Sequence, residues 1–290
     1  MGGIKLQNKK QGILYLCPTP IGNLEDITFR TLKILKQVDL IAAEDTRHTI
    51  RLLNYFEIKK PLTSYHEHNK QEKGHVLINK LLNGEDIALV TDAGMPAISD
   101  PGEDLVKLAI ENHIELVALP GPTAFVLALV VSGFSTRSFI YEGFLSQNKK
   151  SRREELEKFI SETRTVIIYE SPHRLKDLLK DISTVLGDRN LSISRELTKK
   201  YEEIFRGTTE SSIEKFTRED PRGEFIVVIE GASKEKIESE KEEEWEDLSI
   251  REHLVKCIDE GATKKEAIKI VSKQRKIHKN IVYQEALDLE

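Results

Sequence analysis

Three loops rich in glycine and proline contain the residues best suited to surround a ligand. They span residues 18–23, 91–102 and 120–124, and each follows a short apolar run typical of a buried strand. Glycine has no Cβ and proline fixes the backbone path, so backbone groups in such loops can approach a ligand closely. Ligands of α/β sheets bind beyond the carboxyl ends of the strands. The three loops together therefore favour one binding site over three ordinary tight connections.

The composition of these loops restricts the kind of ligand. No G-x-G-x-x-G motif follows the first expected strand, and the chain has no P-loop lysine, so the usual dinucleotide and nucleotide-phosphate sites are not indicated. The loops also contain no lysine or arginine, which argues against a polyphosphate. A zwitterionic or cationic ligand held by backbone groups fits them better.

Charged clusters of both signs follow three other expected strands. They occupy residues 44–47 (Glu-Asp-Thr-Arg), 169–174 (Tyr-Glu-Ser-Pro-His-Arg) and 195–200 (Arg-Glu-Leu-Thr-Lys-Lys). Arginine and lysine bind phosphates, and a carboxylate can accept a proton. These clusters therefore predict the polar wall of a cleft, although the first could simply cap a helix and the others could be ion-paired surface.

A histidine-rich turn, with His66, His68 and Asn69, follows the segment that ends at Tyr65. A His-x-His pair can bind zinc, but no third or fourth ligand is evident in the sequence. Contact with a polar substrate, or an ordinary surface position, is the better interpretation, and we expect no metal site.

Two basic segments stand out in a chain whose formal net charge is −5. Residues 146–153 are expected to form a polar, basic loop, and residues 263–280 carry seven lysines and arginines against one glutamate. Each could be a solvated face, but together they favour separate phosphate contacts. The negative net charge argues against a nucleic-acid site spread over the whole surface.

The order of apolar runs predicts an α/β protein. Residues 13–135 alternate strands with helices and should form an α/β domain with a mostly parallel sheet; one of its helices is expected to begin after Asn23 and to include residues 24–38. Residues 136–232 should form a second α/β domain, with a helix at about 154–162 and some antiparallel pairing among the late strands. The acidic segment 233–248 is expected to be a linker. Residues 249–290 are expected to form a small helical domain like a helix-turn-helix, with a turn at Gly261 and a capping box starting at Thr263.

Bulk composition suits a cytoplasmic protein. The 290 residues are 39% hydrophobic and 32% charged, enough for two domains with cores of their own. The two cysteines, Cys17 and Cys257, suggest no disulfide framework. The N-terminal residues lack the apolar core of a signal peptide, and the longest apolar run, residues 124–131, is too short to cross a bilayer. We therefore expect no membrane association.

Seven motifs in a fixed order give a specific resemblance. They are TPIGNLEDIT, AEDTR, TDAGMPAISDPG, LPGPTAF, YEGFL, YESPHR and RELTKKYEE. In this order they resemble the bacterial small-subunit ribosomal RNA methyltransferase I family, which belongs to the tetrapyrrole methylase superfamily. The resemblance covers about residues 13–232, and the tail from Ser249 looks like the helical domain that many members carry. One departure is Met95, where the family often has threonine.

The resemblance implies two α/β domains of the tetrapyrrole methylase type, with S-adenosylmethionine in the cleft between them, plus the small C-terminal helical domain. It implies a homodimer that methylates the ribose 2′-hydroxyl of a cytidine in the decoding centre of 16S rRNA. Carried over by position, the expected cofactor-binding residues are Pro20, Ala93, Gly94, Met95, Ile98, Thr123 and Ala124. The expected RNA-binding residues are Arg47, His66, Asn69, Arg174, Arg195 and Lys199.

The expected reaction needs a group that accepts the proton of the ribose hydroxyl. Our candidates are Glu196, Glu170 and Asp45, in that order. The acidic net charge suggests that the substrate is 16S rRNA already assembled into the 30S subunit. Two alternatives stay open: a methyltransferase of the same superfamily that acts on a tetrapyrrole or on the diphthamide precursor of a protein, and a non-catalytic RNA-binding protein that uses the C-terminal helices.

Overall fold

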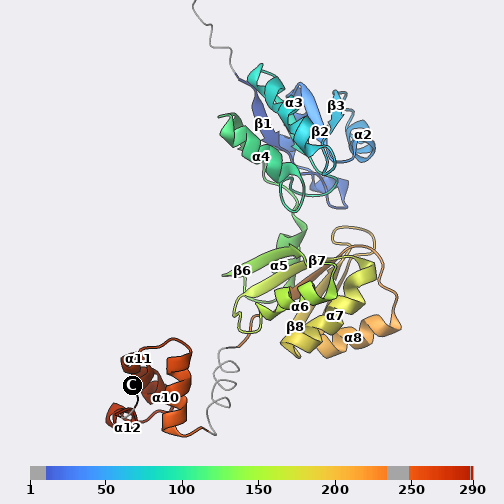
Figure 1. Ribbon diagram of the computed structural model, residues 1–290. Coiled ribbons are helices and arrows are strands. Elements are labelled where there is room, and N and C mark those ends of the chain that lie inside the picture. Colours follow the sequence, from blue (N-terminus) through green and yellow to red (C-terminus); the bar gives the residue numbers. More distant parts are fainter. Residues whose placement is uncertain (1–10, 234–247, 288, 290) are drawn as a thin grey trace, which may run out of the picture. The chain divides into compact units, whose positions relative to one another are not determined.

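The computed structural model describes residues 11–233, 248–287 and 289, and contains two five-stranded sheets followed by a group of helices (Figure 1). The described residues up to 160 and from 164 to 230 form one compact unit, which includes both sheets. Residues 161–163 and the described residues from 231 onward form the second unit. No helix within the described ranges is both long and apolar enough to cross a membrane.

The first sheet is entirely parallel, as the alternating strand and helix pattern predicts. Its strands, in spatial order, are β3 (Leu62–Ser64), β2 (Leu40–Ala43), β4 (Ile87–Val90), β1 (Ile13–Leu16) and β5 (Glu115–Ala118). Every residue of β2 and β4 is buried, because helices cover both faces of the sheet.

The helices of the first sheet divide between its two faces. They are η1 (Leu24–Asp26), α1 (Phe29–Gln37), α2 (Thr46–Tyr55), α3 (Lys70–Leu82) and α4 (Gly102–Glu111). Leu77 of α3 and Leu105 of α4 pack with Leu89 of β4 on one face. Leu35 of α1 and Leu53 of α2 pack with Ile41 of β2 on the other.

The second sheet is mixed. Its strands, in spatial order, are β6 (Phe139–Phe144), β7 (Thr165–Glu170), β10 (Phe225–Ile229), β8 (Asn190–Arg195) and β9 (Glu203–Thr208). Only β6 and β7 are parallel; the other three pairings are antiparallel, as the short spacing of the late strands predicts.

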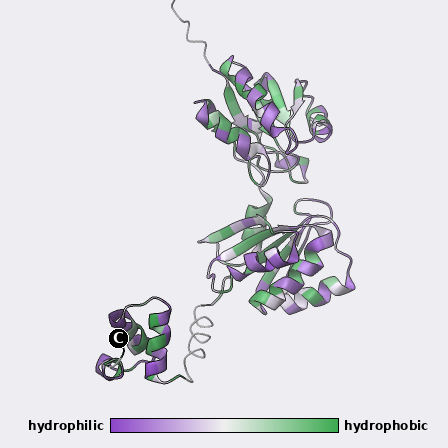
Figure 2. Ribbon diagram, viewed as in Figure 1, coloured by the Kyte–Doolittle hydropathy of each residue, from purple (hydrophilic) through white to green (hydrophobic). Residues whose placement is uncertain are grey.

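The second sheet is also covered on both faces. Its helices are α5 (Ala124–Ser132), α6 (Lys149–Glu157), α7 (Pro172–Leu186) and α8 (Thr209–Arg218). Leu156, Leu178 and Phe216, from the last three of these helices, share one core. Leu129 of α5 packs on the opposite face with Ile167 and Val228, although α5 precedes residue 136. Figure 2 shows hydrophobic and hydrophilic residues side by side along most helices, as expected of helices with one buried face.

The C-terminal helices enclose a core of their own. They are α10 (Ile250–Asp259), α11 (Lys264–Gln274) and α12 (Lys279–Glu285). Leu254, Val271 and Val282, one from each helix, are fully buried together. The predicted turn lies at Gly261, and the predicted capping box joins Thr263 to Glu266. The third helix was not expected from the sequence.

Two expectations about elements are wrong. The single helix expected after Asn23 is two elements: Asn23 caps only the short turn η1, Ile27 is extended, and Thr28 caps α1. The basic segment expected as a loop is largely helical, because Asn148 accepts hydrogen bonds from the backbone of Lys150 and Ser151 and starts α6 at Lys149. The expected acidic linker falls almost wholly on residues 234–247, outside the described residues.

Candidate active site

Backbone hydrogen bonds join the loop after β1 to the loop after β4. Thr19 N donates to Gly94 O at 3.0 Å, and Gly94 N donates to Thr19 O at 3.1 Å. Gly94 has φ of +87°, and a Cβ here would lie 3.3 Å from Ile21 Cγ2. Glycine is therefore needed at this position for its backbone conformation and for the close approach of Ile21.

Asp100 organises the second half of the loop after β4. Its Oδ1 accepts hydrogen bonds from Ala97 N (3.0 Å) and Gly102 N (2.7 Å). Ala97 and Ser99 both adopt positive φ, at 67° and 59°, so this loop holds non-glycine residues in an uncommon conformation. The hydroxyl groups of Ser99 and Tyr141 lie 2.7 Å apart and connect the loop to β6 of the second sheet.

These loops line a cavity of about 430 Å³, together with residues that follow β7 and β8. A volume of this size is typical of small-molecule sites. Six of the seven residues expected to bind the cofactor line it: Ala93, Gly94, Met95, Ile98, Thr123 and Ala124. The seventh, Pro20, lines a second cavity of about 600 Å³. The two cavities adjoin, because both are lined by Ile21, Asp92, Ala93, Lys199 and Glu224.

Glu170, at the end of β7, is a buried carboxylate in the lining of the first cavity. Its Oε1 accepts a hydrogen bond of 2.7 Å from Ser171 N, and its Oε2 lies 3.3 Å from Arg174 NH2. Burial raises the pKa of Glu170, and the Ser171 amide and Arg174 only partly oppose this. The site therefore contains a carboxylate with a greater affinity for protons than an ordinary glutamate.

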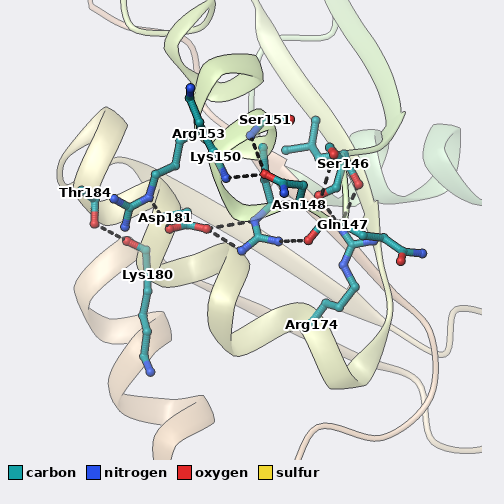
Figure 3. Close-up of polar contacts among 12 residues, drawn as sticks. Ser146, Gln147, Asn148, Lys150, Ser151, Arg153, Arg174, Lys180, Asp181 and Thr184 are labelled. Atoms are coloured by element: carbon teal, nitrogen blue, oxygen red, sulfur yellow. Dashed lines mark hydrogen bonds and ion pairs between the residues drawn. The ribbon is translucent and has the colours of Figure 1, made fainter.

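The guanidinium group of Arg174 is bound by other groups of the protein. Its NH2 group donates to Leu145 O (2.7 Å) and Ser146 O (3.1 Å), in addition to its ion pair with Glu170. Figure 3 shows this side chain reaching the segment after β6. Arg174 thus supports this segment and Glu170, and the RNA contact expected of it stays a prediction.

Glu196 and Lys199 lie in the loop after β8, and both line the first cavity. Lys199 Nζ lies 3.0 Å from Glu196 Oε1 and 3.0 Å from Glu224 Oε2. Burial tends to raise the pKa of Glu196, but hydrogen bonds from Glu224 N and Lys199 outweigh it and lower the pKa. Of the two glutamates, Glu196 is thus the weaker proton acceptor.

Asp45 and Arg47 form an ion pair beside the cavities but line neither of them. Asp45 caps α2 by accepting from Arg47 N at 2.8 Å, and its Oδ2 lies 2.7 Å from Arg47 NH2. These contacts lower the pKa of Asp45 strongly. The Arg47 side chain is 86% exposed, so it can reach an external partner, whereas Asp45 is poorly suited to accept a proton.

Three further residues expected to bind RNA, His66, Asn69 and Arg195, also lie outside the two cavity linings. Asn69 Oδ1 accepts from His66 N at 2.9 Å, so these two residues shape the turn after β3. Arg195 Nε donates to Arg222 O at 2.7 Å, and its NH1 lies 3.4 Å from Glu203. The sequence did not indicate these internal partners.

The basic segment 149–153 supplies fewer free charges than its sequence suggests. Arg152 is buried and its NH2 lies 2.6 Å from Asp181 Oδ2, while Arg153 Nε lies 2.7 Å from Asp181 Oδ1 (Figure 3). Both arginines therefore join α6 to α7 through Asp181, and the phosphate contacts expected of this segment stay a prediction. Lys149 and Lys150 remain exposed.

Asp92 is a site residue that the sequence alone did not indicate. It lines both cavities, and its Oδ1 accepts a hydrogen bond of 3.1 Å from Asp45 N. Burial raises the pKa of Asp92, and the nearby Glu44 carboxylate adds to the effect. Its place in the TDAG motif was the available signal. Within the described residues, no three or more His, Cys, Asp and Glu side chains are arranged to hold a metal ion.

Comparison with known proteins identifies the family of this chain. Residues 13–213 match the model of the Tetrapyrrole (Corrin/Porphyrin) Methylases. A protein of Bacillus subtilis (strain 168), named ribosomal RNA small subunit methyltransferase I, is 49% identical over 94% of this chain and 93% of its own. A protein of the same name from Halalkalibacterium halodurans is 51% identical over 96% of this chain and 95% of its own.

Solved structures of the same fold are more distant in sequence. The cobalamin biosynthetic enzyme cobalt precorrin-4 methyltransferase has a TM-score of 0.59 and 16% identity, and the match covers 79% of this chain and 98% of that one. Uroporphyrin-III C-methyltransferase from Thermus thermophilus, in complex with S-adenosylhomocysteine, has a TM-score of 0.55 and 15% identity, covering 75% of this chain and 97% of that one. With its fold, its loops and its full-length relatives in agreement, this chain belongs to the tetrapyrrole (corrin/porphyrin) methylase family, in the group of the ribosomal RNA small subunit methyltransferases I.

Proposed function

We propose that this methyltransferase uses S-adenosylmethionine to methylate the ribose 2′-hydroxyl of a cytidine in the decoding centre of 16S rRNA. The observation that carries the proposal is the 49–51% identity, over nearly the full chain, to relatives named ribosomal RNA small subunit methyltransferase I. The choice of the 2′-hydroxyl and of a decoding-centre cytidine follows from the resemblance of the seven motifs to that family.

The residues around the first cavity fit a cationic cofactor. The lining contains the carboxylates of Glu44, Asp92, Asp100 and Glu170, and its lysine, Lys199, is paired with two glutamates. This excess of negative charge favours a sulfonium cation. S-adenosylmethionine, when bound, would supply an electrophilic methyl group. Ala93, Gly94, Met95, Ile98, Thr123 and Ala124 would hold it, with Pro20 at the adjoining cavity.

The protein must also accept the proton of the hydroxyl group. We propose Glu170 for this role, because it lines the first cavity and its pKa is raised by burial. Asp92 is the second candidate, because it lies where the two cavities meet. Glu196 ranks below both, since its pKa is lowered, and Asp45 ranks last because it lines neither cavity.

The predicted RNA-binding residues divide by their contacts. Arg47, which is mostly exposed, is the best placed to bind phosphate. His66 and Asn69 would meet RNA at the turn after β3. Arg174, Arg195 and Lys199 would act by positioning the cavity wall, since each is bound to carboxylates or carbonyl groups of the protein.

We also propose a cytoplasmic homodimer that acts on assembled 30S subunits. Val126, Leu127 and Val130 of α5 and Phe139 of β6 expose large apolar surface, which is the kind of surface that a second copy of the chain would cover. A single species of monomer mass in sedimentation would contradict the dimer. Equal methylation of naked rRNA and of 30S subunits would contradict the preference for assembled subunits.

The proposal can be tested by methyl transfer from labelled S-adenosylmethionine to 30S subunits that lack the modification. We expect label in 16S rRNA at one cytidine, with the adjacent phosphodiester resistant to alkali because the 2′-hydroxyl is blocked. Label in a small-molecule or protein fraction instead would favour a tetrapyrrole or diphthamide-precursor substrate. A non-catalytic RNA-binding protein would transfer no label, and its isolated residues 249–290 would bind RNA as tightly as the whole chain.

A pair of glycine variants separates cofactor binding from general damage in this assay. Gly94→Ala places a Cβ against Ile21 beside the cavity, whereas Gly133→Ala adds one at a similar φ of +83° with no atom within 4 Å. We expect the first variant to lose affinity for S-adenosylhomocysteine and to transfer little label. The second should bind and transfer as the unaltered protein does.

A further inference from the structure

We propose that the second cavity receives the acceptor nucleotide, with Arg51 and His48 binding backbone phosphates and Tyr55 stacking on a base. This inference rests on the proposed function, because it concerns the RNA side of the same reaction. None of these three residues belongs to the motifs that carry the family resemblance.

The second cavity has the position and size that an acceptor site needs. It has a volume of about 600 Å³ and shares Ile21, Asp92, Ala93, Lys199 and Glu224 with the first cavity. A group held in the second cavity therefore lies next to whatever occupies the first. Asp92 contributes a carboxylate to both linings.

One face of α2 supplies the wall of this cavity that is suited to a nucleotide. His48, Arg51, Leu52 and Tyr55 all line the cavity. Their spacing of three, four and seven residues places them along one stripe of the helix. Leu52 is buried, whereas Tyr55 is 64% exposed. The stripe thus combines two basic side chains with an accessible aromatic ring.

The charge of Arg51 is available to a ligand. The Arg51 side chain is exposed and makes no hydrogen bond or ion pair with any part of the chain that the structure describes. Arg47 and Lys199, in contrast, are each paired with a carboxylate. An unpaired arginine beside a cavity is suited to the phosphate groups of an external ligand.

This combination indicates single-stranded nucleic acid. Proteins recognise unpaired nucleotides by stacking bases on aromatic rings while basic side chains follow the phosphates. The stripe on α2 provides both kinds of contact at the entrance to the reaction centre.

The test is steady-state methylation of 30S subunits that lack the modification, by four full-length variants. Arg51→Gln removes the free charge, and Arg30→Gln is the matched control, an exposed helical arginine that lines neither cavity. Tyr55→Leu removes the ring, and Tyr55→Phe keeps it. Affinity for S-adenosylhomocysteine, measured by calorimetry, checks that each variant retains the first cavity.

We expect Arg51→Gln and Tyr55→Leu each to raise KM for 30S subunits about tenfold, with unchanged affinity for S-adenosylhomocysteine. Arg51→Gln should also reduce the slope of log KM against log salt by roughly 0.7–0.9, as the loss of one phosphate contact requires. Tyr55→Phe and Arg30→Gln should behave as the unaltered protein. A merely structural role for Arg51 would leave the salt slope unchanged.

Two results would overturn the inference in distinguishable ways. If the unaltered protein labels rRNA while Arg51→Gln and Tyr55→Leu retain their KM and salt slope, the second cavity is not the nucleotide site and the proposed function stands. If the unaltered protein labels no rRNA at all, the proposed function and this inference both fail.

Discussion

Glu170 is the single residue whose replacement should most affect the chemical step. If it accepts the proton, Glu170→Gln should lower kcat by about a hundredfold or more, with little effect on affinity for S-adenosylhomocysteine. Because the carboxylate must be ionised and burial raises its pKa, kcat should rise with pH through a value above the ordinary pKa of glutamate. The variant should lose that dependence, which a pH profile of kcat will reveal.

Asp45→Asn is the natural control for this experiment. Asp45 was one of the three predicted proton acceptors but lines neither cavity. The kcat of the Asp45→Asn variant should therefore stay within a few-fold of that of the unaltered protein. Asparagine caps a helix about as well as aspartate, and the ion pair with Arg47 is exposed, so the free energy of unfolding should stay within about 1 kcal/mol of the unaltered value. Normal activity in Glu170→Gln together with a large loss in Asp92→Asn would transfer the role to Asp92.

At this scale the sequence predicted loop residues better than charged residues. Ala93, Gly94, Met95 and Ile98 line one cavity because they are near neighbours in one loop, and their position after a strand was readable. The position of the Arg174 side chain, in contrast, depends on its hydrogen bonds to Leu145 O and Ser146 O. Such partners lie far away in the sequence, and nothing in a local motif indicates whether an arginine will turn inward or outward.

Among the elements, the attachment of α6 to α7 depends on Asp181. The side chains of Asp181 and Arg152 are only 2% and 5% exposed. Asp181→Asn should leave a buried guanidinium without its carboxylate and lower the free energy of unfolding by about 3–5 kcal/mol. Asp177→Asn, which changes an exposed aspartate on the same helix, should stay within about 0.5 kcal/mol. Urea denaturation of both variants gives the comparison.

The same ion pairs predict how stability depends on pH. Burial tends to raise the pKa of Asp181, but Arg153 and Arg152 outweigh it and lower the pKa below the unfolded value. The stabilisation should therefore be fully present above the ordinary pKa of aspartate and disappear as the pH falls through the lowered value. The difference in stability between the unaltered protein and Asp181→Asn should narrow over that acidic range; a constant difference would contradict this account.

The type of each element was more predictable than its limits. Apolar runs such as β4 and β10 are buried on both faces, and their shortness and β-branched residues mark them as strands. The two wrong expectations concern where helices begin. Thr28 caps α1, so this helix begins later than expected, and Asn148 caps α6, so that helix begins earlier than the apolar pattern suggested. More than one residue in each sequence could cap the helix. Which of them does so depends on the tertiary packing of the preceding segment, which the local sequence does not reveal.

For the whole molecule, the C-terminal unit should contribute charge to RNA binding. Lys265, Lys269 and Lys273 are exposed at intervals of four residues along α11, so they share one face of that helix. Replacing all three with glutamine should raise KM for 30S subunits and reduce its salt dependence, while affinity for S-adenosylhomocysteine stays unchanged. An unaltered KM and salt slope would mean that this unit does not bind RNA through α11.

The strand order of the second sheet sets a sequence of events during synthesis on the ribosome. The first sheet has all its strands once β5 has emerged, and it can form early. The centre of the second sheet is β10, the last of its strands to be made, which joins β7 to β8. Until residue 229 emerges, β7 and β8 each present an open edge to other nascent chains. A pause in translation just before β10 would therefore prolong the exposure of two unpaired strand edges.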